Sequence, residues 1–203
     1  MIECRGIQAH VGSFALRDIS FIVPTGSHAI LAGPTASGKT TLLELITGAI
    51  IPTAGTLLVN GVDVTCTVPE SRGVGLVPQH GYLFPHLNVR QNIEYGAHDT
   101  ATVSSLARGF GVEHLMARSV ASLSGGERQL VALCRALASR RSVLLLDEPL
   151  SALDTGRRGA ALRELAALQA LWSFTVLHAT HQDDNAGPGS VRFEMNDGMI
   201  TRC

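Results

Sequence analysis

The sequence lacks a long uninterrupted apolar stretch, and this absence excludes a chain that crosses a membrane alone. No segment approaches the ~20 apolar residues that a transmembrane helix needs, and the first twelve residues contain no apolar core suited to a signal peptide. An excess of one charge is also lacking, because sixteen basic residues stand against seventeen acidic ones. The net charge of -1 provides no bulk attraction to nucleic acid or anionic lipid. We therefore expect no nucleic-acid partner, and we expect any membrane to be reached through another protein.

Paired cysteines are missing as well. The four cysteines are Cys4, Cys66, Cys134 and Cys203, and no two of them form a CxxC pair. We therefore predict reduced thiols of the cytosolic kind. Apolar residues make up 45% of the chain and charged residues 16%. This balance excludes a disordered chain and predicts a single domain over residues 1–203, with a core that needs no disulfide or metal.

Short apolar runs alternate with longer helical patterns, which predicts an α/β domain with a largely parallel sheet. The runs predicted as strands are Ile19–Val23, His28–Leu31, Thr56–Val59, Val74–Val77, Val143–Leu146 and Phe174–Leu177, with edge strands at Val191–Met195 and Met199–Thr201. The patterns predicted as helices are Lys39–Thr47, Gly125–Ala138 and Arg157–Leu171. Residues 79–122 differ, because Gly, Pro and His interrupt short helical patterns at Asn88–Tyr95 and Val103–Arg108. We predict an inserted helical subdomain there.

A phosphate-binding pattern stands between the first buried strand and the first helix. It reads Gly33-Pro34-Thr35-Ala36-Ser37-Gly38-Lys39-Thr40, with Thr41 in the same turn. Glycines let the backbone wrap around phosphate oxygens, and the amides at the helix N-terminus supply partial positive charge. Lys39 adds a full charge for the β and γ phosphates, and the Thr40 hydroxyl can ligate Mg²⁺. The context disfavours the alternative of a glycine-rich turn without a ligand.

Two carboxylates follow the most apolar strand. Asp147 and Glu148 come directly after Val143–Leu146, and the carboxyl end of a buried parallel strand is where ligands bind in such sheets. Asp147 is suited to hold Mg²⁺, and Glu148 is suited to polarise an attacking water as a general base. The alternative, two surface carboxylates that end a strand, leaves the phosphate loop without the acidic partner it needs.

The stretch Leu123-Ser124-Gly125-Gly126-Glu127-Arg128-Gln129 resembles the signature motif of the ABC transporter ATPases. The resemblance covers nearly the whole chain. It implies the P-loop NTPase fold of the ABC type, with a mostly parallel core sheet, an antiparallel β subdomain and an inserted helical subdomain. It also implies a head-to-tail dimer, homomeric or heteromeric, in which each ATP lies between the phosphate loop of one subunit and the signature of the other. The residues themselves allow two interpretations that can hold together. One is a second anion site on the Ser124, Gly125 and Gly126 amides, and the other is a capping box of Ser124 and Glu127.

Further residues match other positions of this family. Gln79 resembles the glutamine that contacts Mg²⁺ and the attacking water, and residues 151–154 resemble the loop that crosses the dimer interface. His181 resembles the histidine that contacts the γ-phosphate. The resemblance thus implies Glu148, His181, Lys39 and Gln79 as the catalytic group, and Thr40, Gln79 and Asp147 around the metal. A metal-binding pair of His178 and His181 is disfavoured because no third ligand stands near.

The chain departs from the family pattern at three places. Val11 stands where an aromatic residue usually stacks on adenine, so the alternatives are that Phe14 or His10 takes that role or that stacking on the base is weak. Ala36 replaces a frequent glycine, and we expect phosphate binding to survive provided that its φ is negative. The segment that follows His181 is shorter than usual.

Residues 78–93 resemble the importer branch, especially ATPases for oxyanions, polyamines and sugars. The resemblance implies an ATP-hydrolysing subunit that powers import through a transmembrane permease, with a solute-binding protein, at the cytoplasmic face of the membrane. An export or lipid-release ATPase and a catalytically weak partner subunit are the alternatives. The apolar group Tyr82, Leu83, Phe84 and Leu87 is expected either to contact the permease or to form the core of the helical subdomain. No C-terminal regulatory domain is expected.

Overall fold

The computed structural model describes residues 1–181 and 190–202. Its larger sheet has six strands in the order β10-β9-β3-β8-β7-β6. Their bounds are β10 (Met199–Arg202), β9 (Val191–Asn196), β3 (His28–Ala32), β8 (Thr175–Thr180), β7 (Val143–Asp147) and β6 (Val74–Val77). All neighbouring pairs are parallel except β9 with β10. The predicted α/β architecture with a largely parallel sheet is confirmed.

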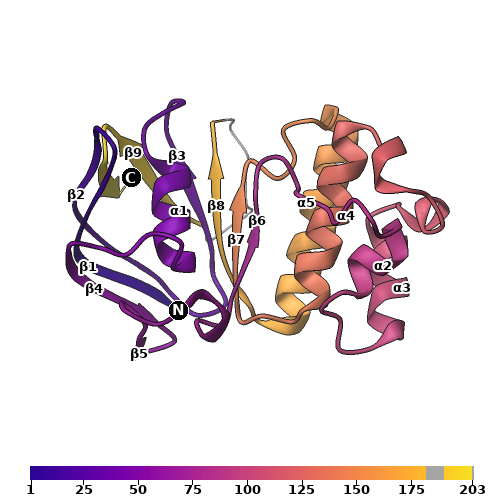
Figure 1. Cartoon of the computed structure of the whole chain (residues 1–203), viewed down its shortest axis with the longest axis horizontal. Coiled ribbons are helices and arrows are strands. Elements are labelled where there is room, and N and C mark those ends of the chain that lie inside the picture. Colours follow the sequence, from indigo (N-terminus) through magenta and orange to yellow (C-terminus); the bar gives the residue numbers. More distant parts are fainter. Residues whose placement is uncertain (182–189, 203) are drawn as a thin grey trace.

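A smaller antiparallel sheet has four strands in the order β2-β1-β4-β5. Their bounds are β2 (Phe14–Val23), β1 (Ile2–Val11), β4 (Ala54–Val59) and β5 (Val62–Asp63). Helix α1 (Lys39–Thr47) lies between this sheet and the larger one (Figure 1). Its residues Leu42, Leu43, Leu45 and Ile46 are at most 1% exposed, so the helix behind the phosphate loop is held by apolar packing on both sides.

Helices α4 (Gly125–Ala138) and α5 (Thr155–Trp172) cover the other face of the larger sheet. Strand β7 shows why the chain forms these layers. Val143 and Leu145 pack on the side of α1, whereas Leu144 and Leu146 pack on the side of α4 and α5. Every residue of β7 is buried, which explains its continuous apolar run, because a parallel strand covered on both faces has no polar side.

Helices α2 (Val89–Glu94) and α3 (Thr100–Gly109) pack against α4, at the opposite end of the molecule from the antiparallel sheet (Figure 1). Three 3₁₀ turns complete the described elements, at Pro69–Ser71, Glu113–Leu115 and Val120–Ser122. The short helices fall within the predicted insertion, although α4 shares their core. The boundary at 79–122 therefore stays a prediction.

The sequence analysis missed one strand and placed another wrongly in the sheet. Strand β1 was not predicted, because register shifts near Gly6 break the alternation that would have revealed it. Strand β9 is not an edge strand, since it pairs with both β10 and β3. Of the helices, α5 begins earlier than expected, because the Asp154 side chain accepts a hydrogen bond from the Arg157 amide and caps it.

No helix in the described part of the chain is both long and apolar enough to cross a bilayer. Cys4, Cys66 and Cys134 are free thiols, as predicted, and Cys203 lies outside the described residues.

Candidate functional site

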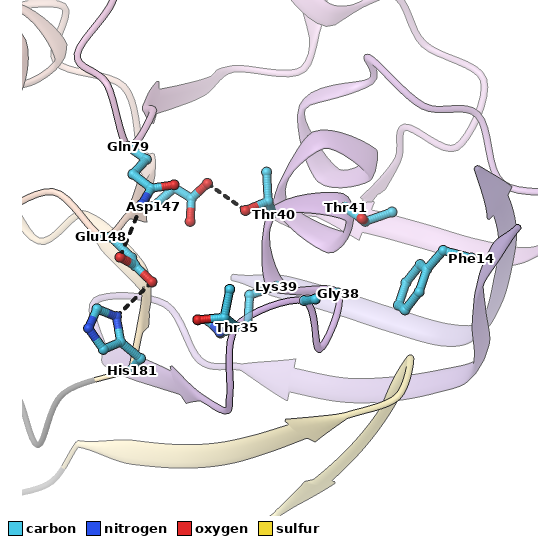
Figure 2. A pocket seen from close by; sticks show the side chains of 11 residues that line it. Phe14, Thr35, Gly38, Lys39, Thr40, Thr41, Gln79, Asp147, Glu148 and His181 are labelled. Atoms are coloured by element: carbon cyan, nitrogen blue, oxygen red, sulfur yellow. Dashed lines mark hydrogen bonds and ion pairs between the residues drawn. The ribbon is translucent and has the colours of Figure 1, made fainter. Parts of the chain in front are cut away.

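A pocket of about 500 Å³ lies where four parallel strands end. It is lined by Phe14, Thr35, Ala36, Gly38, Lys39, Thr40, Thr41, Gln79, Asp147, Glu148 and His181. All of these except Phe14 lie at or just beyond the carboxyl ends of β3, β6, β7 and β8, with Lys39, Thr40 and Thr41 in the first turn of α1. Because the carboxyl ends of parallel strands meet at one edge, residues far apart in the sequence converge here. Figure 2 shows Gln79, Glu148 and His181 at one end of the pocket and Phe14 at the other, with the phosphate loop between them.

The phosphate loop needs glycine at two of its positions. Gly33 has a φ of 151° and Gly38 a φ of 106°, and both values are strained for other residues. A Cβ at Gly33 would also collide with the Met195 carbonyl oxygen, and one at Gly38 would lie 2.6 Å from Phe14 Cζ. The backbone can therefore follow this path only with glycine at both positions.

The backbone angle φ at Ala36 differs from the value that we expected. Its φ is +64°, in the left-handed region, whereas the sequence argument assumed a negative value. An alanine there costs about 1–2 kcal/mol. The loop keeps its path all the same, with the Ser37 amide donating to the Pro34 carbonyl oxygen and the Ser37 carbonyl oxygen accepting from the Gly198 amide. The hydrogen bonds of the neighbouring residue Ser37 thus hold Ala36 in this unfavourable backbone conformation.

Lys39 is the only lysine in the sequence, and it is 5% exposed. Its Nζ donates to the carbonyl oxygens of Gly33 and Pro34, at 2.8 Å each. Burial lowers the pKa of the ammonium, and the carboxylates of Glu148 and Asp147 oppose that shift. The chain therefore holds a positive charge inside its glycine-rich loop, facing two acidic side chains.

Asp147 ends strand β7 beside the first turn of α1. The Thr40 hydroxyl donates to its Oδ2 at 2.8 Å, as Figure 2 shows. Burial raises the pKa of Asp147, the Thr40 hydrogen bond acts against this shift, and Glu148 adds to it. A hydroxyl and a carboxylate side by side form the oxygen donor set that suits Mg²⁺. These two residues fit the predicted metal.

Glu148 has a φ of +47° and turns its carboxylate back into the pocket. His181 Nδ1 lies 2.8 Å from Oε1, and Gln79 Nε2 donates to Oε2 at 3.3 Å. The structure thus brings together three residues that the sequence analysis grouped. The shortened segment after His181, residues 182–189, lies outside the described residues.

The signature residues do not line this pocket. Ser124 is the N-cap of α4, and its hydroxyl oxygen accepts a hydrogen bond from the Glu127 amide at 3.3 Å. Glu127 Oε2 accepts from the Ser124 amide and hydroxyl, at 2.7 Å each. These bonds, the backbone one first, lower the pKa of Glu127. The capping-box reading is therefore present, with Gly125 and Gly126 inside the first turn.

Phe14, rather than Val11, reaches the pocket. The two residues pair across the turn that joins β1 to β2, so their side chains share a face of the hairpin. Val11 is 44% exposed and is not among the residues that line the pocket, whereas Phe14 lines it and packs on Gly38. Sequence reasoning had named Phe14 as a substitute, and the structure places its ring beside the phosphate loop.

The apolar group after Gln79 contains both exposed and packed side chains. Tyr82 is 69% exposed, whereas Leu83 packs against the helical core. Phe84 is half-buried, with its ring centroid 4.3 Å from that of Tyr95 and the Arg135 guanidinium 5.0 Å above it.

The structure also brings one residue to the site to which the sequence analysis assigned no role. This residue is Gln129, whose side chain forms hydrogen bonds to the carbonyl oxygens of both Gln79 and Glu148.

Known proteins share this sequence pattern and fold. A family model described as "ABC transporter" matches residues 16–151. The molybdate/tungstate import ATP-binding protein WtpC of Thermococcus kodakarensis is 41% identical over 194 residues, which cover 92% of this chain and 58% of that protein. The thiamine import ATP-binding protein ThiQ of Salmonella paratyphi A is 41% identical over 187 residues, which cover 88% of this chain and 80% of that protein.

The chain spans only part of some relatives, 58% of the Thermococcus protein's length. Among solved structures, the dimeric structure of a bacterial ABC transporter cassette matches with a TM-score of 0.89 at 24% identity, covering 100% of this chain and 97% of that one. That likeness shows the fold. Taken with the family model and the relatives, these matches establish that the chain belongs to the ABC transporter family, as an ATPase domain.

Proposed function

We propose that this chain is an ATP-hydrolysing subunit that powers solute import through a membrane permease. The observation that carries the proposal is the meeting of Lys39, Glu148, Gln79 and His181 in one pocket of about 500 Å³. The matched relatives are import ATP-binding proteins by name, which supports import rather than export. Because the chain covers part of the longer relatives, the activity and the partners are proposed for the domain itself.

The triphosphate of ATP binds along the phosphate loop. Backbone amides of residues 34–41 and the N-terminus of α1 supply partial positive charge, and Lys39 supplies a full charge close to the β and γ phosphates. Thr40 and Asp147 would hold Mg²⁺, with Gln79 near it, and the ion would neutralise charge on the phosphate oxygens. The lowered pKa of Lys39 reverses when phosphate charge arrives, because an anion favours the ammonium form.

Hydrolysis uses the carboxylate of Glu148 as a general base. A water oriented by Gln79 attacks the γ-phosphorus, Glu148 accepts the water's proton, and the bond to the β-phosphate oxygen breaks to leave ADP and phosphate. His181 and Lys39 stabilise the charge on the γ-phosphoryl oxygens. Gln79 and His181 contact the two carboxylate oxygens, so these two side chains orient the base.

The adenine stacks on Phe14, at the end of the pocket away from Glu148 (Figure 2). Its ring lies beside the loop, and stacking on an aromatic ring contributes about 1–3 kcal/mol in nucleic-acid complexes. Val11, the residue at the usual aromatic position, then has no more than a flanking contact.

Two copies share each ATP, and the permease receives the resulting motion. The amides of Gly125 and Gly126, with Ser124, approach the γ-phosphate from the second copy, which is a homodimeric or a related heterodimeric partner. The exposed Tyr82 and the half-buried Phe84 form part of the surface that meets the permease. A solute-binding protein delivers the cargo, and the domain works at the cytoplasmic face of the membrane.

The decisive experiment is the Glu148→Gln variant. It removes the base and keeps the shape of the side chain, so turnover should fall about 100- to 10,000-fold, with ATP affinity unchanged and a trapped dimer visible by light scattering. Glu70→Gln makes the same change at an exposed residue and should keep full turnover. Wild-type protein without ATPase activity, or normal turnover in Glu148→Gln, would refute the proposed function.

A further inference from the structure

We propose that Gln129 is a positioning residue that holds Glu148 and Gln79 in place for hydrolysis, and this inference rests on the proposed function. Gln129 lies in α4, four residues beyond the first glycine of that helix, and its side chain is 5% exposed. It does not line the pocket. It therefore acts through other residues rather than on the nucleotide.

The amide group of Gln129 joins two loops that are far apart in the sequence, the one after β6 and the one between β7 and α5. Its Nε2 lies 3.2 Å from the Gln79 carbonyl oxygen, 3.3 Å from the Glu148 carbonyl oxygen and 3.0 Å from Ser151 Oγ. Its Oε1 accepts a hydrogen bond from the Ala152 amide at 2.9 Å. Because a backbone amide only donates, this last bond settles which end of the side chain is the oxygen.

The bonds form a closed network around the Glu148 carbonyl oxygen. The Ser151 hydroxyl donates to that oxygen at 3.1 Å while it accepts from Gln129 Nε2. The Ser151 amide also points to it, at 3.3 Å. One buried side chain thus links the loop after β6 to two points of the loop after β7, Glu148 and residues 151–152. Losing it would remove the bonds that Gln129 makes to the Gln79 carbonyl oxygen and the Ala152 amide, while Ser151 would still bond to the Glu148 carbonyl oxygen.

Glu148 needs such support because its backbone is strained. A φ of +47° is unusual for a residue with a Cβ, and such conformations persist only where the surroundings over-determine them. The Glu148 amide is tied to the Ala179 carbonyl oxygen, and Gln129 holds the carbonyl side of the same residue. Ser151 also bonds to this carbonyl oxygen, so the loss of Gln129 loosens the second tie, and the backbone can then relax and carry the carboxylate away from its attack position.

The arrangement also connects the two proposed phosphate-binding elements. The helix that carries Gln129 begins with the signature residues Gly125 and Gly126, and the base lies at the other end of the Gln129 contacts. A shift of α4 when a second copy closes is therefore transmitted to Glu148 and Gln79. Within the described residues, the hydrogen bonds of Gln129 go to Gln79, Glu148, Ser151 and Ala152 and not to Lys39 or the phosphate loop, so ATP affinity should not depend on it.

The test replaces Gln129 by leucine and compares it with a matched control. Gln169 is also buried, at 8% exposure, and donates to two backbone carbonyl oxygens, those of Gly26 and Phe174. Gln129→Leu should lower kcat about 30- to 100-fold, since a misplacement of about 1 Å has an effect of that size, while KM and the Kd for ATP change less than about threefold. Gln169→Leu should lose stability without this selective loss of kcat.

Two further measurements separate positioning from general destabilisation. In a Glu148→Gln background, Gln129→Leu should have almost no added effect on single-turnover hydrolysis, because it acts through the missing base. Hydrogen exchange should quicken in peptides covering residues 76–84 and 147–153 in Gln129→Leu but not in Gln169→Leu. If Gln129→Leu does not fold, Gln129→Glu keeps the acceptor for Ala152 and removes the amide donors.

The outcomes are distinct. Loss of kcat confined to Gln129 variants, coupling to Glu148 and local exchange together support the proposal. Equal effects in the Gln129 and Gln169 variants, independent effects of Gln129 and Glu148, or unchanged exchange would overturn it. If the wild-type protein proves inactive, the proposed function fails, and the exchange measurement alone then decides whether Gln129 positions these loops.

Discussion

Helices α1 and α4 both begin at glycine-rich turns, but among the described residues only α4 has side chains that cap its N-terminus. No described side chain caps α1, whose N-cap is Gly38 with a left-handed φ. Helix α4 is closed by a capping box of Ser124 and Glu127, which leaves the Gly125 and Gly126 amides outside the box. The first turn of α1 is thus open to an anion, whereas that of α4 is stabilised without one.

The surroundings of the two helix N-termini also differ. The turn before α1 lines a pocket with buried Lys39 and Asp147, both with shifted pKa values, whereas Ser124 is exposed. The comparison teaches that one chain contains a helix N-terminus that opens into a pocket and a second helix N-terminus that is capped by its own side chains. We infer that α1 binds ATP first and that α4 contributes when a second copy closes.

Removing the charge at α1 should have the largest effect. Lys39→Ala should weaken ATP binding about 100-fold, because it removes charge-assisted hydrogen bonds to phosphate, as measured by fluorescence titration. Since Lys39 is the only lysine, an amine-selective reagent offers a second check. ATP should protect Lys39 and leave the Met1 amine reactive, and unchanged affinity in Lys39→Ala would contradict direct binding at α1.

Removing the ring at the far end of the same pocket should have the next largest effect. Phe14→Ala should weaken ATP about tenfold, in line with stacking of about 1–3 kcal/mol, and should leave inorganic tripolyphosphate binding unchanged. Val11→Ala, on the other strand of the turn, is the matched control and should bind ATP normally. The reverse pattern would restore Val11 as the adenine contact.

A change at α4 should affect turnover and leave the first binding step intact. Ser124→Ala should lower unfolding free energy by about 1 kcal/mol through loss of the cap, and should lower ATPase turnover about tenfold. Monomer affinity for ATP should stay the same. Ser119→Ala removes the cap of another exposed turn and should keep full turnover. A large loss of monomer affinity in Ser124→Ala would erase the distinction between the two helices.

The strain in the α1 loop predicts a small gain. Ala36→Gly should raise the unfolding free energy by about 0.5–1 kcal/mol, because relief at a φ of +64° outweighs the entropy of a freer unfolded chain. Thermal unfolding would measure it. Ala49→Gly, at an exposed alanine without a positive φ, should lower stability instead. A lower melting temperature in Ala36→Gly would show that the loop is not strained.

The α4 cap should also depend on pH. Hydrogen bonds from Ser124 lower the pKa of Glu127 below its usual 4.5, so the carboxylate stabilises the folded state above pH 4.5 and this contribution is lost as pH falls through the folded pKa. The stability gap between wild type and Glu127→Ala should therefore be present at pH 7 and shrink below pH 4.5. Denaturant unfolding at both pH values measures this, and a constant gap would show that the cap does not depend on ionised Glu127.

Much of the architecture could be predicted because its signals are local. The apolar run of β7 indicated a strand buried on both faces, and Gly125–Ala138 was predicted with the bounds that the structure shows, since its helical spacing and its cap are both readable in sequence. Strand β1 escaped because its register shifts are set by pairing with β2 and β4. Those shifts depend on strands that are distant in the chain.

The sequence by itself identified the phosphate loop and the signature turn, because each is a contiguous stretch whose chemistry lies in backbone amides and, in the loop, one lysine. Only the tertiary structure decided the rest. It gave Ala36 a left-handed φ, brought the ring of Phe14 beside Gly38, and joined Gln129 to the Glu148 carbonyl oxygen. Each of these depends on where the ends of separate strands meet, and packing of the whole sheet sets that position.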